Sequence, residues 1–400
     1  MTADVGAGPL AGIKVIEIAT VLMGPFAAQM LGDLGADVVK VETMQGDSSR
    51  AMGDGPHREL SGISLNLHRN KQSIGLDLKS NEGRDVLLRL LADADVLITN
   101  LRPGPLQRLR LDYENIGDDL PRLIYCQAQG FRSESDEANK PAYDDVIQAL
   151  AGFPQLSTIA FDETRFLPTV VVDKVAGMFI TQGVLAALVA RGVTGRGQRI
   201  EVPMFDAGLA FNLVEHLAGA AIPGGTAGYG RVLSPHRGPH RTLDGHVALL
   251  PYTDSHWTML FRSVGQEDLL DRPCFANHRS RLSNADEVYG LLASIVAKRT
   301  SGEWLDLCHE MDIPVAAVMS LDEIVTDPAN HRGVLSDREH PVVGTFREIK
   351  QPIVFDDSGQ VAHRPAPLKH EHTMEVLAAA GYSEAEINSL TKQGAVIQRN

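Results

Sequence analysis

Short apolar runs with the character of β-strands alternate with helical patterns through the first half of the chain. The strand-like runs are IKVIEIAT (13–20), DVVKVE (37–42), QSIGLDL (72–78), DVLITN (95–100) and LIYCQAQG (123–130). Helical patterns lie between them, such as PFAAQMLGDLG (25–35) and NEGRDVLLRLLADA (81–94). This alternation is typical of βαβ units, in which helices join parallel strands. The sequence therefore predicts an α/β domain with a mostly parallel sheet.

Size and charge limit the classes of protein to which the chain can belong. Its 400 residues, 44% of them hydrophobic, suit a large enzyme-like chain of about two domains. A net charge of −14 disfavours nucleic acid and anionic membranes as partners, because the average field repels both. The three cysteines lie far apart in sequence, which predicts neither a disulfide framework nor a metal or redox pair: Cys126, Cys274 and Cys308.

The sequence also predicts a cytoplasmic location. The first residues, MTADVGAGPLAG, lack the charged start and apolar core of a signal peptide. The longest apolar stretch, Val175–Ala190, contains Gln182 and is short for a bilayer span, so we expect no membrane partner.

A change of composition near residue 223 divides the chain. Before it, helices are predicted over Lys174–Arg191 and Phe205–Ile222, with a strand over 198–204 between them. After the glycine-rich stretch PGGTAGYGR, both tryptophans and two of the three cysteines follow. We expect a large domain over 1–222, a linker over 223–231, a small domain over 232–333 and a C-terminal segment over 334–400.

Several common cofactor and catalytic motifs are absent from the sequence. No G-x-G-x-x-G follows a strand, since GAGPLAG (6–12) precedes the first one, so NAD binding is not expected. No G-x-S-x-G elbow is present either. Four loop histidines lack an HExxH or Cys/His set and are interpreted as solvated, without a metal: His236, His240, His370 and His372.

Basic residues gather where a ligand could bind. The stretch ITNLRPGPLQRLRL (98–111) begins at the end of a predicted strand and carries Arg102, Arg108 and Arg110. In an acidic chain these arginines pair either with internal carboxylates or with a ligand phosphate. The same alternatives hold for the basic residues of RNKQSIGLDLK: Arg69, Lys71 and Lys79. The polar loop Thr43–Lys71 either lines a site or is mobile.

The stretch LPTVVVDKVAGM (167–178) places Asp173 between an apolar β-like run and a helix of small residues. One interpretation is a helix N-cap, since aspartate accepts hydrogen bonds from free backbone N–H groups there. The other is a carboxylate nucleophile, with Ala176 and Gly177 leaving room for substrate. Both roles use the same helix N-terminus, so the residues alone leave them open.

Five ordered motifs resemble the class III CoA-transferase family, which includes formyl-CoA transferase, carnitine CoA-transferase and α-methylacyl-CoA racemase. The motifs lie within 9–42, 70–87, 100–111, 142–152 and 195–207, and looser similarity covers RTLDGHVAL (241–249) and APLKHEHT (366–373). The resemblance implies a Rossmann-like large domain completed by the C-terminal tail, with a smaller α+β domain inserted. It also implies an interlocked homodimer.

The same resemblance implies roles for individual residues. Asp173, in DKVAG, matches the family's aspartate nucleophile. CoA contacts are implied for Leu22, Met23, Thr43, Leu76, Asp77, Leu78, Lys79, Asn100, Leu101, Arg102, Arg108, Tyr143 and Asp144. Thr43 stands where formyl-CoA transferase has arginine and Pro141 where it has lysine, so phosphate contacts at these two positions are not carried over. A glycine-rich loop that covers the intermediates is matched by Gly224, Gly225, Gly228 and Gly230, or these glycines form a plain linker.

The expected function is CoA transfer from an acyl-CoA to a carboxylic acid through an aspartyl-CoA thioester on Asp173, with no tightly bound cofactor. Family racemases have a histidine where this chain has Tyr143, and tyrosine is a poor base at neutral pH. Three alternatives stay open: an acyl-CoA racemase or isomerase, a CoA thioester hydrolase, and a catalytically silent CoA-binding protein.

Overall fold

The chain folds into two compact units, as seen in a computed structural model that describes residues 8–356 and 363–399. The first seven residues, on which the signal-peptide expectation rests, lie outside these ranges. Unit 1 contains the chain up to Ala151, then Pro168–Phe211 and the segment from Arg332 onward. Unit 2 contains Gly152–Leu167 and Asn212–His331. The contacts therefore group 152–167 and 212–222 with the smaller unit, whereas the sequence analysis assigned them to the large domain.

Unit 1 is built on a seven-stranded sheet in the order β12-β3-β2-β1-β4-β5-β6. Every neighbouring pair is parallel except β12 with β3, so the predicted α/β domain with a mostly parallel sheet is confirmed. The strand bounds are β1 (Lys14–Ile18), β2 (Asp37–Glu42), β3 (Lys71–Leu76), β4 (Val96–Thr99), β5 (Ile124–Gln129), β6 (Arg199–Pro203) and β12 (Val396–Ile397). Strand β1 lies at the centre, where the strand order reverses direction between β2 and β4, and such a switch point is where doubly wound sheets bind ligands.

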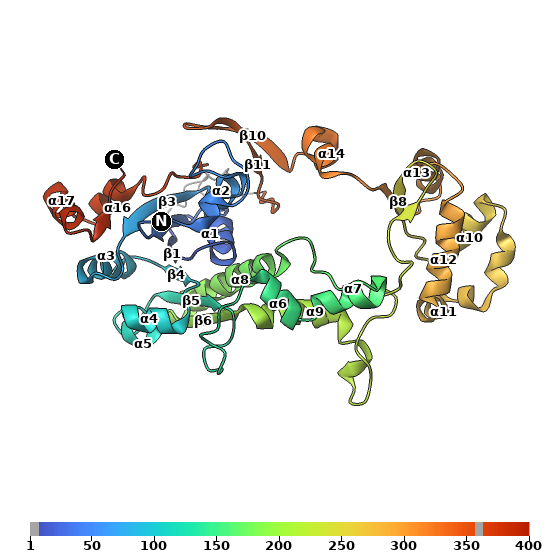
Figure 1. Ribbon diagram of the computed structural model, residues 1–400, viewed down its shortest axis with the longest axis horizontal. Coiled ribbons are helices and arrows are strands. Elements are labelled where there is room, and N and C mark those ends of the chain that lie inside the picture. The colour runs from blue at the N-terminus through green and yellow to red at the C-terminus, as the bar shows by residue number, and fades with distance from the viewer. Residues whose placement is uncertain (1–7, 357–362, 400) are drawn as a thin grey trace. The chain divides into compact units, whose positions relative to one another are not determined.

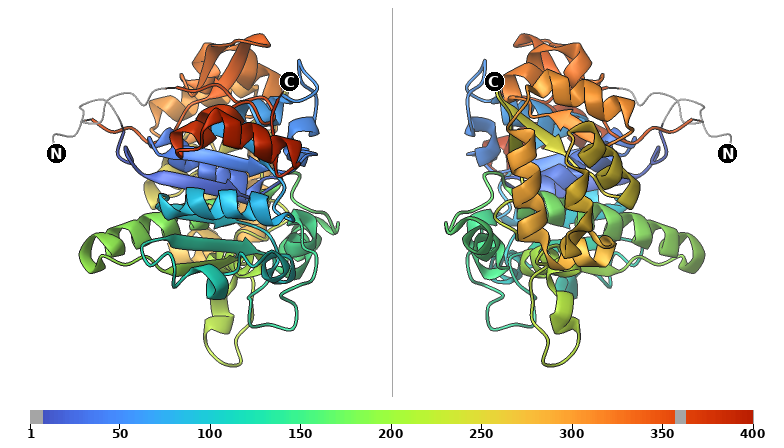
Figure 2. Two further views of the ribbon diagram at one scale, coloured as in Figure 1. Left: turned by 90° about the vertical axis from the view of Figure 1, so that its left-hand side faces the viewer. Right: turned by 90° about the vertical axis from the view of Figure 1, so that its right-hand side faces the viewer.

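Helices cover both faces of this sheet (Figures 1 and 2). Helices α1 and α8 pack together on one face, and α3, α4, α5, α16 and α17 lie on the other. The helical elements of unit 1 are α1 (Met23–Asp33), η1 (Ser48–Ala51), α2 (Gly62–Leu67), α3 (Asn81–Ala92), α4 (Pro103–Leu109), α5 (Tyr113–Ile116), α6 (Asp144–Leu150), α8 (Val171–Thr194), α16 (Thr373–Ala379) and α17 (Glu384–Lys392). Helix α9 (Met204–His216) begins in unit 1 and ends in unit 2.

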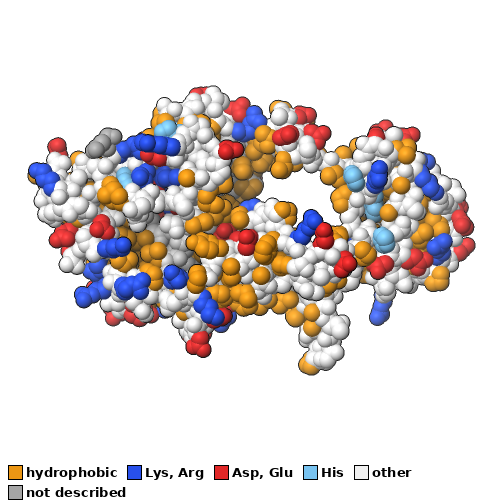
Figure 3. Space-filling model, in the orientation of Figure 1, with side chains coloured by type: hydrophobic (Ala, Val, Ile, Leu, Met, Phe, Trp, Pro, Cys, Tyr) orange, Lys and Arg blue, Asp and Glu red, His pale blue; other side chains and the backbone are white. Residues whose placement is uncertain are grey.

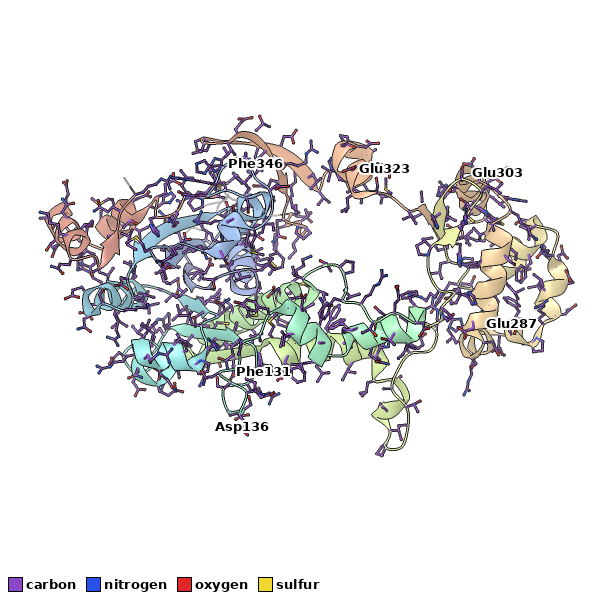
Figure 4. All side chains as sticks on the ribbon, in the orientation of Figure 1. Phe131, Asp136, Glu287, Glu303, Glu323 and Phe346 are labelled. Atoms are coloured by element: carbon purple, nitrogen blue, oxygen red, sulfur yellow. The ribbon has the colours of Figure 1, made fainter. Side chains whose placement is uncertain are left out.

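The C-terminal segment completes unit 1. Strand β12 pairs with β3, with Val396 opposite Leu76. Upstream, the hairpin of β10 (Leu335–His340) and β11 (Gly344–Ile349) carries Phe346, labelled in Figure 4, which packs in a small core with Leu60 and Leu65. This core ties the loop Thr43–Lys71 to the distant C-terminal segment.

Helix α8 differs from its expected form at both ends. It begins at Val171, and the apolar run before it forms no strand, because the valines make the buried first helical turn, with Val172 fully buried. The expectation of a β-like run at this point is therefore wrong. The helix has 24 residues, more than the apolar stretch Val175–Ala190 within it, and by length and composition alone it is long enough to cross a membrane. In unit 1 it packs against α1, β5 and β6.

Unit 2 has a small antiparallel sheet in the order β7-β8-β9 and a core of aromatic side chains that includes Trp257, Phe261 and Phe275. Helices α13 and α14 each begin with a capping box, whose glutamates Glu303 and Glu323 are labelled in Figure 4. The elements are α7 (Phe153–Phe161), η2 (Ala218–Ala221), β7 (His240–Arg241), β8 (His246–Leu249), α10 (Asp254–Ser263), η3 (Glu267–Asp271), η4 (Pro273–Phe275), α11 (His278–Ser283), α12 (Ala285–Val296), α13 (Ser301–Glu310), β9 (Val315–Ala317), α14 (Leu321–Thr326) and α15 (Pro328–His331).

Candidate active site

Asp173 lies in the first turn of α8, and its side chain does not cap the helix. The cap position is Val170, which makes no side-chain cap hydrogen bond. Instead, Oδ1 of Asp144 accepts hydrogen bonds from the backbone N–H groups of Val172 (2.7 Å) and Asp173 (3.0 Å). The N-cap interpretation of Asp173 is therefore wrong, because a carboxylate from another helix already satisfies these donors.

Asp144 is the first residue of α6 and is almost fully buried. Its Oδ2 accepts a hydrogen bond of 2.6 Å from Nε2 of Gln148, one turn further along the same helix. The same Nε2 donates to the backbone carbonyl of Thr169 at 3.2 Å. Two side chains of α6 thus hold the backbone that leads into Asp173.

The Asp173 carboxyl itself is left without a fixed partner. Across residues 8–356 and 363–399, no hydrogen bond or ion pair holds its oxygens, and the side chain is half-buried. Burial, followed by the nearby charge of Asp144, raises the pKa of Asp173 to about 7. A desolvated carboxyl that titrates near neutral pH is suited to act as a nucleophile or in proton transfer, and such groups concentrate at functional sites.

The DxxxG spacing has a packing reason. Gly177 lies one helical turn after Asp173 on the same face of α8. A Cβ atom at Gly177 would lie 2.9 Å from Cδ1 of Phe26 and 3.0 Å from the carbonyl oxygen of Met23. Only glycine therefore lets α8 approach the first turn of α1 this closely. The motif places the Asp173 turn beside the turn between β1 and α1, where CoA contacts at Leu22 and Met23 are predicted.

Two predicted CoA-binding segments meet at the carboxyl ends of neighbouring strands. Leu22 occupies the N-cap position of α1 without a side-chain cap, and it follows β1. Asn100 follows β4, and its amide both accepts from the Thr20 N–H (3.0 Å) and donates to the Thr20 carbonyl (2.7 Å). The side chain of Asn100 therefore orients the β1–α1 turn.

The predicted arginine cluster of Arg102, Arg108 and Arg110 forms no ion pairs with carboxylates among the described residues. Arg102 precedes α4, and its guanidinium donates to the backbone carbonyl of Asn139 at 2.7 Å. Arg108 lies in α4 and Arg110 at its end, and both are exposed. Among the residues described, none of the three guanidinium groups forms an ion pair within 4.0 Å. This leaves ligand phosphate as the alternative that the geometry favours.

Two other basic residues, Arg69 and Lys71, do pair with carboxylates of the same chain. The Arg69 guanidinium pairs with Asp33 at 2.6 Å, and the Lys71 ammonium pairs with Glu17 at 2.8 Å, with both pairs buried. Lys79 is exposed beside the start of α3. Only Lys79 of this group is therefore free to reach a ligand.

The remaining predicted contacts lie at the edge of unit 1 or in its core. Thr43 is exposed just after β2, and Tyr143 is 66% exposed at the cap position of α6. The side chain of Leu76 is fully buried, so a ligand could meet only its backbone. Asp77, Leu78 and Leu101 are half-buried in turns that follow β3 and β4. The CoA-binding role of each stays a prediction.

The glycines of the predicted covering loop lie in unit 2 after η2. The backbone N–H of Gly225 donates to the Ile222 carbonyl (3.0 Å), and that of Gly228 donates to the His216 carbonyl (2.8 Å). Gly224 and Gly230 have open space where a Cβ would project. The loop is therefore held at its base, and its covering role stays a prediction.

The histidine interpretation needs correction. His370 and His240 are 3% and 5% exposed, so they are not solvated. The Nε2 of His370 donates to the Thr43 carbonyl at 2.8 Å, which satisfies the buried ring nitrogen. Within the ranges that the structure describes, no group of three or more His, Cys, Asp or Glu side chains could hold a metal ion.

The sequence analysis missed a set of buried charges beneath the β1–α1 turn: Glu17, Lys40, Asp47 and Lys71. A signal for it was present, because Lys40 interrupts the apolar run DVVKVE and Glu17 the run KVIEI. A charged residue inside a central parallel strand is buried on both faces and must find a partner.

Comparison with known proteins gives the family. The sequence profile of CoA-transferase family III matches residues 10–373. The succinate–glutarate CoA-transferase of Agrobacterium fabrum is 31% identical, over 92% of this chain and 95% of that protein. The formyl-CoA:oxalate CoA-transferase of Escherichia coli O157:H7 is 30% identical, over 97% and 99%. A crystal structure of a CaiB/BaiF family protein from Brucella suis has a TM-score of 0.77 at 28% identity, covering 94% of this chain and 100% of that one.

The mostly parallel sheet, the carboxyl of raised pKa at the start of α8 and the arginines without carboxylate partners among the described residues together suit a protein that binds an anionic ligand. The chain belongs to CoA-transferase family III. It is a family III CoA-transferase, and enzymes of this family use CoA thioesters as substrates.

Proposed function

We propose that this enzyme moves CoA from an acyl-CoA thioester to a carboxylic acid through an aspartyl-CoA thioester on Asp173. The observation that carries the proposal is the Asp173 carboxyl. It lies at the start of α8 without a hydrogen-bonding partner among the described residues, and its pKa is raised to about 7. A carboxylate that is poorly solvated gives up little solvation free energy when it attacks a carbonyl carbon.

The proposed reaction conserves the thioester. The Asp173 carboxylate attacks the acyl-CoA carbonyl, the C–S bond breaks, and a mixed anhydride and CoA thiolate form. The thiolate then attacks the aspartyl carbonyl of the anhydride, which releases the donor carboxylate and leaves aspartyl-CoA. The acceptor carboxylate repeats the two steps in reverse and leaves as its CoA thioester. No ATP or tightly bound cofactor is required, because each bond broken is replaced by one of similar energy.

Asp144 supports this chemistry by position and by charge. Its Oδ1 holds the N–H groups of Val172 and Asp173, which fixes the first turn of α8. Its negative charge adds to burial in disfavouring the ionised form of Asp173 before reaction. Attack on the thioester removes the charge from Asp173, so this repulsion is relieved as the anhydride forms.

The CoA phosphates are assigned to the carboxyl edge of the sheet. Arg102 and Arg108 carry guanidinium groups without carboxylate partners among the described residues, and the N-terminus of α1 at Leu22 has no side-chain cap. Backbone N–H groups at a helix start and arginine forks both suit phosphate oxygens. Acyl-CoA donors and carboxylic acids are accordingly the proposed partners. The relatives are named for succinate, glutarate and oxalate, and these acids are the first to test.

A homodimer is also proposed. Helix α8 exposes Met178, Val189 and Val193 at 60%, 73% and 87%, and α6 exposes Val146 and Leu150. Figure 3 shows hydrophobic side chains gathered on the surface over α6 and α8. Apolar area of this extent on a charged chain favours a protein partner, and a second copy agrees with the interlocked dimer that the family resemblance implies. A cytoplasmic location is proposed with it, supported by three buried cysteines that are all free.

The decisive experiment is a search for the covalent intermediate. Wild-type enzyme is incubated with succinyl-CoA, formyl-CoA and acetyl-CoA, digested at low pH and examined by mass spectrometry for a CoA-sized adduct on the peptide that contains Asp173. We expect the adduct in wild type and in the control Asp145→Asn, whose exposed carboxyl neighbours Asp144, and none in Asp173→Asn. CoA exchange between acids in Asp173→Asn would refute the mechanism.

The same panel separates the alternatives. Exchange of the α-proton into D₂O without an acid acceptor would indicate an isomerase. Release of free CoA without an acceptor would indicate a hydrolase. CoA binding that survives Asp173→Ala, with no adduct from any donor in wild type, would indicate a silent binding protein. Tyr143, largely exposed and a poor base, gives no support to the isomerase.

A further inference from the structure

The turn between β1 and α1 contains a strained residue. Val21 has φ of +71°, in the left-handed region that β-branched side chains rarely occupy. It directly precedes Leu22 and Met23, the predicted CoA contacts, and lies at the carboxyl end of the central strand. Such strain persists only where surrounding groups hold the backbone in place.

Asp47 supplies the group that holds Val21. Its Oδ1 accepts the Val21 N–H at 3.0 Å and the Ser49 N–H at 2.9 Å, and the residue is 4% exposed. The second oxygen, Oδ2, lies 2.8 Å from Nζ of Lys40, and both side chains are fully buried. Asp47 therefore joins the turn to a charge in the interior of strand β2.

Two buried ammonium groups fix the backbone on either side of Val21. Lys40 donates to the carbonyl of Ala19 at 2.8 Å, and Lys71 donates to that of Pro25 at 2.7 Å. Glu17 lies between the lysines, 2.7 Å from Lys40 and 2.8 Å from Lys71. Side chains from β1, β2, β3 and the loop after β2 thus meet under one turn.

Stability alone is a weak reason for such a cluster. Taking four ionised groups out of water carries a large desolvation cost, and apolar side chains of similar volume would often serve a core equally well. What apolar side chains cannot do is hold particular carbonyl and N–H groups at particular points. The hydrogen bonds to residues 19, 21 and 25 are the distinctive product of this cluster.

We propose that Asp47 is a positioning residue for CoA: together with Lys40 and Lys71 it holds the β1–α1 turn, with Val21 strained, in the conformation that receives the CoA substrate. The part of this inference that concerns CoA rests on the proposed function. The part that concerns the turn does not, because its contacts are all made by residues of this chain.

The test compares Asp47→Ala and Asp47→Asn with a matched buried pair. Asp33 is also buried, pairs with Arg69 and lies at the far end of α1, away from the turn. Asp33→Asn therefore reports the general effect of breaking a buried pair in unit 1. Val21→Gly, alone and in the Asp47→Ala background, reports the strain, because glycine adopts positive φ at no steric cost.

Three readouts are used on the full-length protein. Hydrogen exchange followed by mass spectrometry measures protection of the peptide that covers residues 19–26, without any ligand. Calorimetry with CoA measures affinity, and thermal melting records stability. We expect Asp47→Ala to speed exchange in this peptide and to weaken CoA binding by about tenfold, the effect of losing one hydrogen bond to a charged group. Asp47→Asn, which keeps an acceptor for Val21, is expected to fall between Asp47→Ala and wild type.

Val21→Gly separates an effect on the turn from a general loss of stability. In the double variant Asp47→Ala with Val21→Gly, we expect CoA affinity to recover by at least threefold while the melting temperature stays low. Asp33→Asn should lower the melting temperature and leave CoA affinity within twofold of wild type. If Asp47→Ala does not fold, Asp47→Asn against Asp33→Asn makes the same comparison.

Two outcomes would overturn the inference: unchanged exchange over residues 19–26 in the Asp47 variants, or an equal loss of CoA affinity in Asp33→Asn. These are distinct from failure of the proposed function. If the proposed function fails, wild type will bind CoA without forming the Asp173 adduct, or will not bind CoA at all. The exchange measurement will still report on the turn.

Discussion

The backbone N–H of Asp173 donates a hydrogen bond of 3.0 Å to the carboxylate of Asp144. The residue that carries the proposed chemistry thus begins its helix against a second buried carboxylate from α6. This contact orients the helix turn and places like charges near each other, so Asp144 both positions Asp173 and adds to burial, the larger cause, in raising its pKa.

The pH dependence of activity should follow this pair. Because the proposed nucleophile is the ionised form of Asp173, kcat/KM should rise with pH through about 7, the value to which burial and Asp144 raise its pKa. Asp144→Asn keeps an oxygen for the two N–H groups but removes the charge, so the rising limb should move to lower pH. Burial remains the larger cause, so the shift should be partial. Asp145→Asn, at an exposed position, should leave the limb in place, and a limb unchanged in Asp144→Asn would contradict the assignment.

Asp173 should lower the stability of the fold at neutral pH. Its pKa is about 7 in the folded protein, against the ordinary aspartate value of 3.8, so unfolding releases a proton between these pH values. Stability contributed by the protonated carboxyl is therefore present at low pH and lost as pH rises from about 4 to 7. Asp173→Asn avoids this loss and should be more stable than wild type at pH 8, on the order of a few kcal/mol, with little difference at pH 4. Urea unfolding at both pH values measures it; an equal difference at both would argue against a raised pKa.

Gly177 should tolerate no side chain, whereas Gly192 in the same helix should. A Cβ at Gly177 would meet Phe26 and the Met23 carbonyl, so Gly177→Ala should cost about 1–3 kcal/mol of stability and weaken CoA binding by displacing the β1–α1 turn. Gly192 is exposed with nothing within 4 Å, so Gly192→Ala should stabilise by about 0.5–1 kcal/mol. Chemical denaturation and CoA calorimetry on both variants provide the measurement. Equal behaviour of the two would rule out the close approach of α8 to α1.

Arg108 should contribute to CoA affinity more than to turnover. Its exposed guanidinium forms no ion pair within the part of the chain described, so Arg108→Ala should raise KM for acyl-CoA by about tenfold with kcat nearly unchanged. Arg196 is an exposed arginine before β6, at the amino edge of the sheet, and Arg196→Ala is the matched control. The difference should shrink at high salt, as screening weakens phosphate contacts. A fall in kcat at constant KM would place Arg108 elsewhere in the mechanism.

The exposed valines of α8 should lie in the proposed dimer interface. Val189 and Val193 are one turn apart on the helix and highly exposed. A double substitution to glutamate should shift the protein from dimer to monomer in sedimentation velocity, because charges buried in an apolar interface lack partners. Thr194→Glu, at an exposed residue that ends the same helix, is the control. A stable dimer in the double variant would place the interface on another surface.

Much of unit 1 could be predicted from local patterns. The runs DVVKVE and LIYCQAQG became β2 and β5, and the glycine after DKVA was recognised together with Asp173. These features follow from side-chain periodicity and from motif spacing, both of which are properties of neighbouring residues. The wrong prediction of a β-like run before Asp173 has the same origin, because it too relied on neighbouring residues. Valines favour strands locally, but here they pack as the first turn of a helix, with Val172 fully buried.

The sequence by itself determined the parallel α/β architecture, the family and the aspartate on which the chemistry is proposed to occur. Only the tertiary structure decided that Asp144, 29 residues away, caps the helix of Asp173, and that Asp47 holds Val21 from 26 residues away. The physical reason is that burial and charge interactions depend on distance in space and on the exclusion of water. Neither quantity can be obtained from the order of residues until the sheet has brought them together.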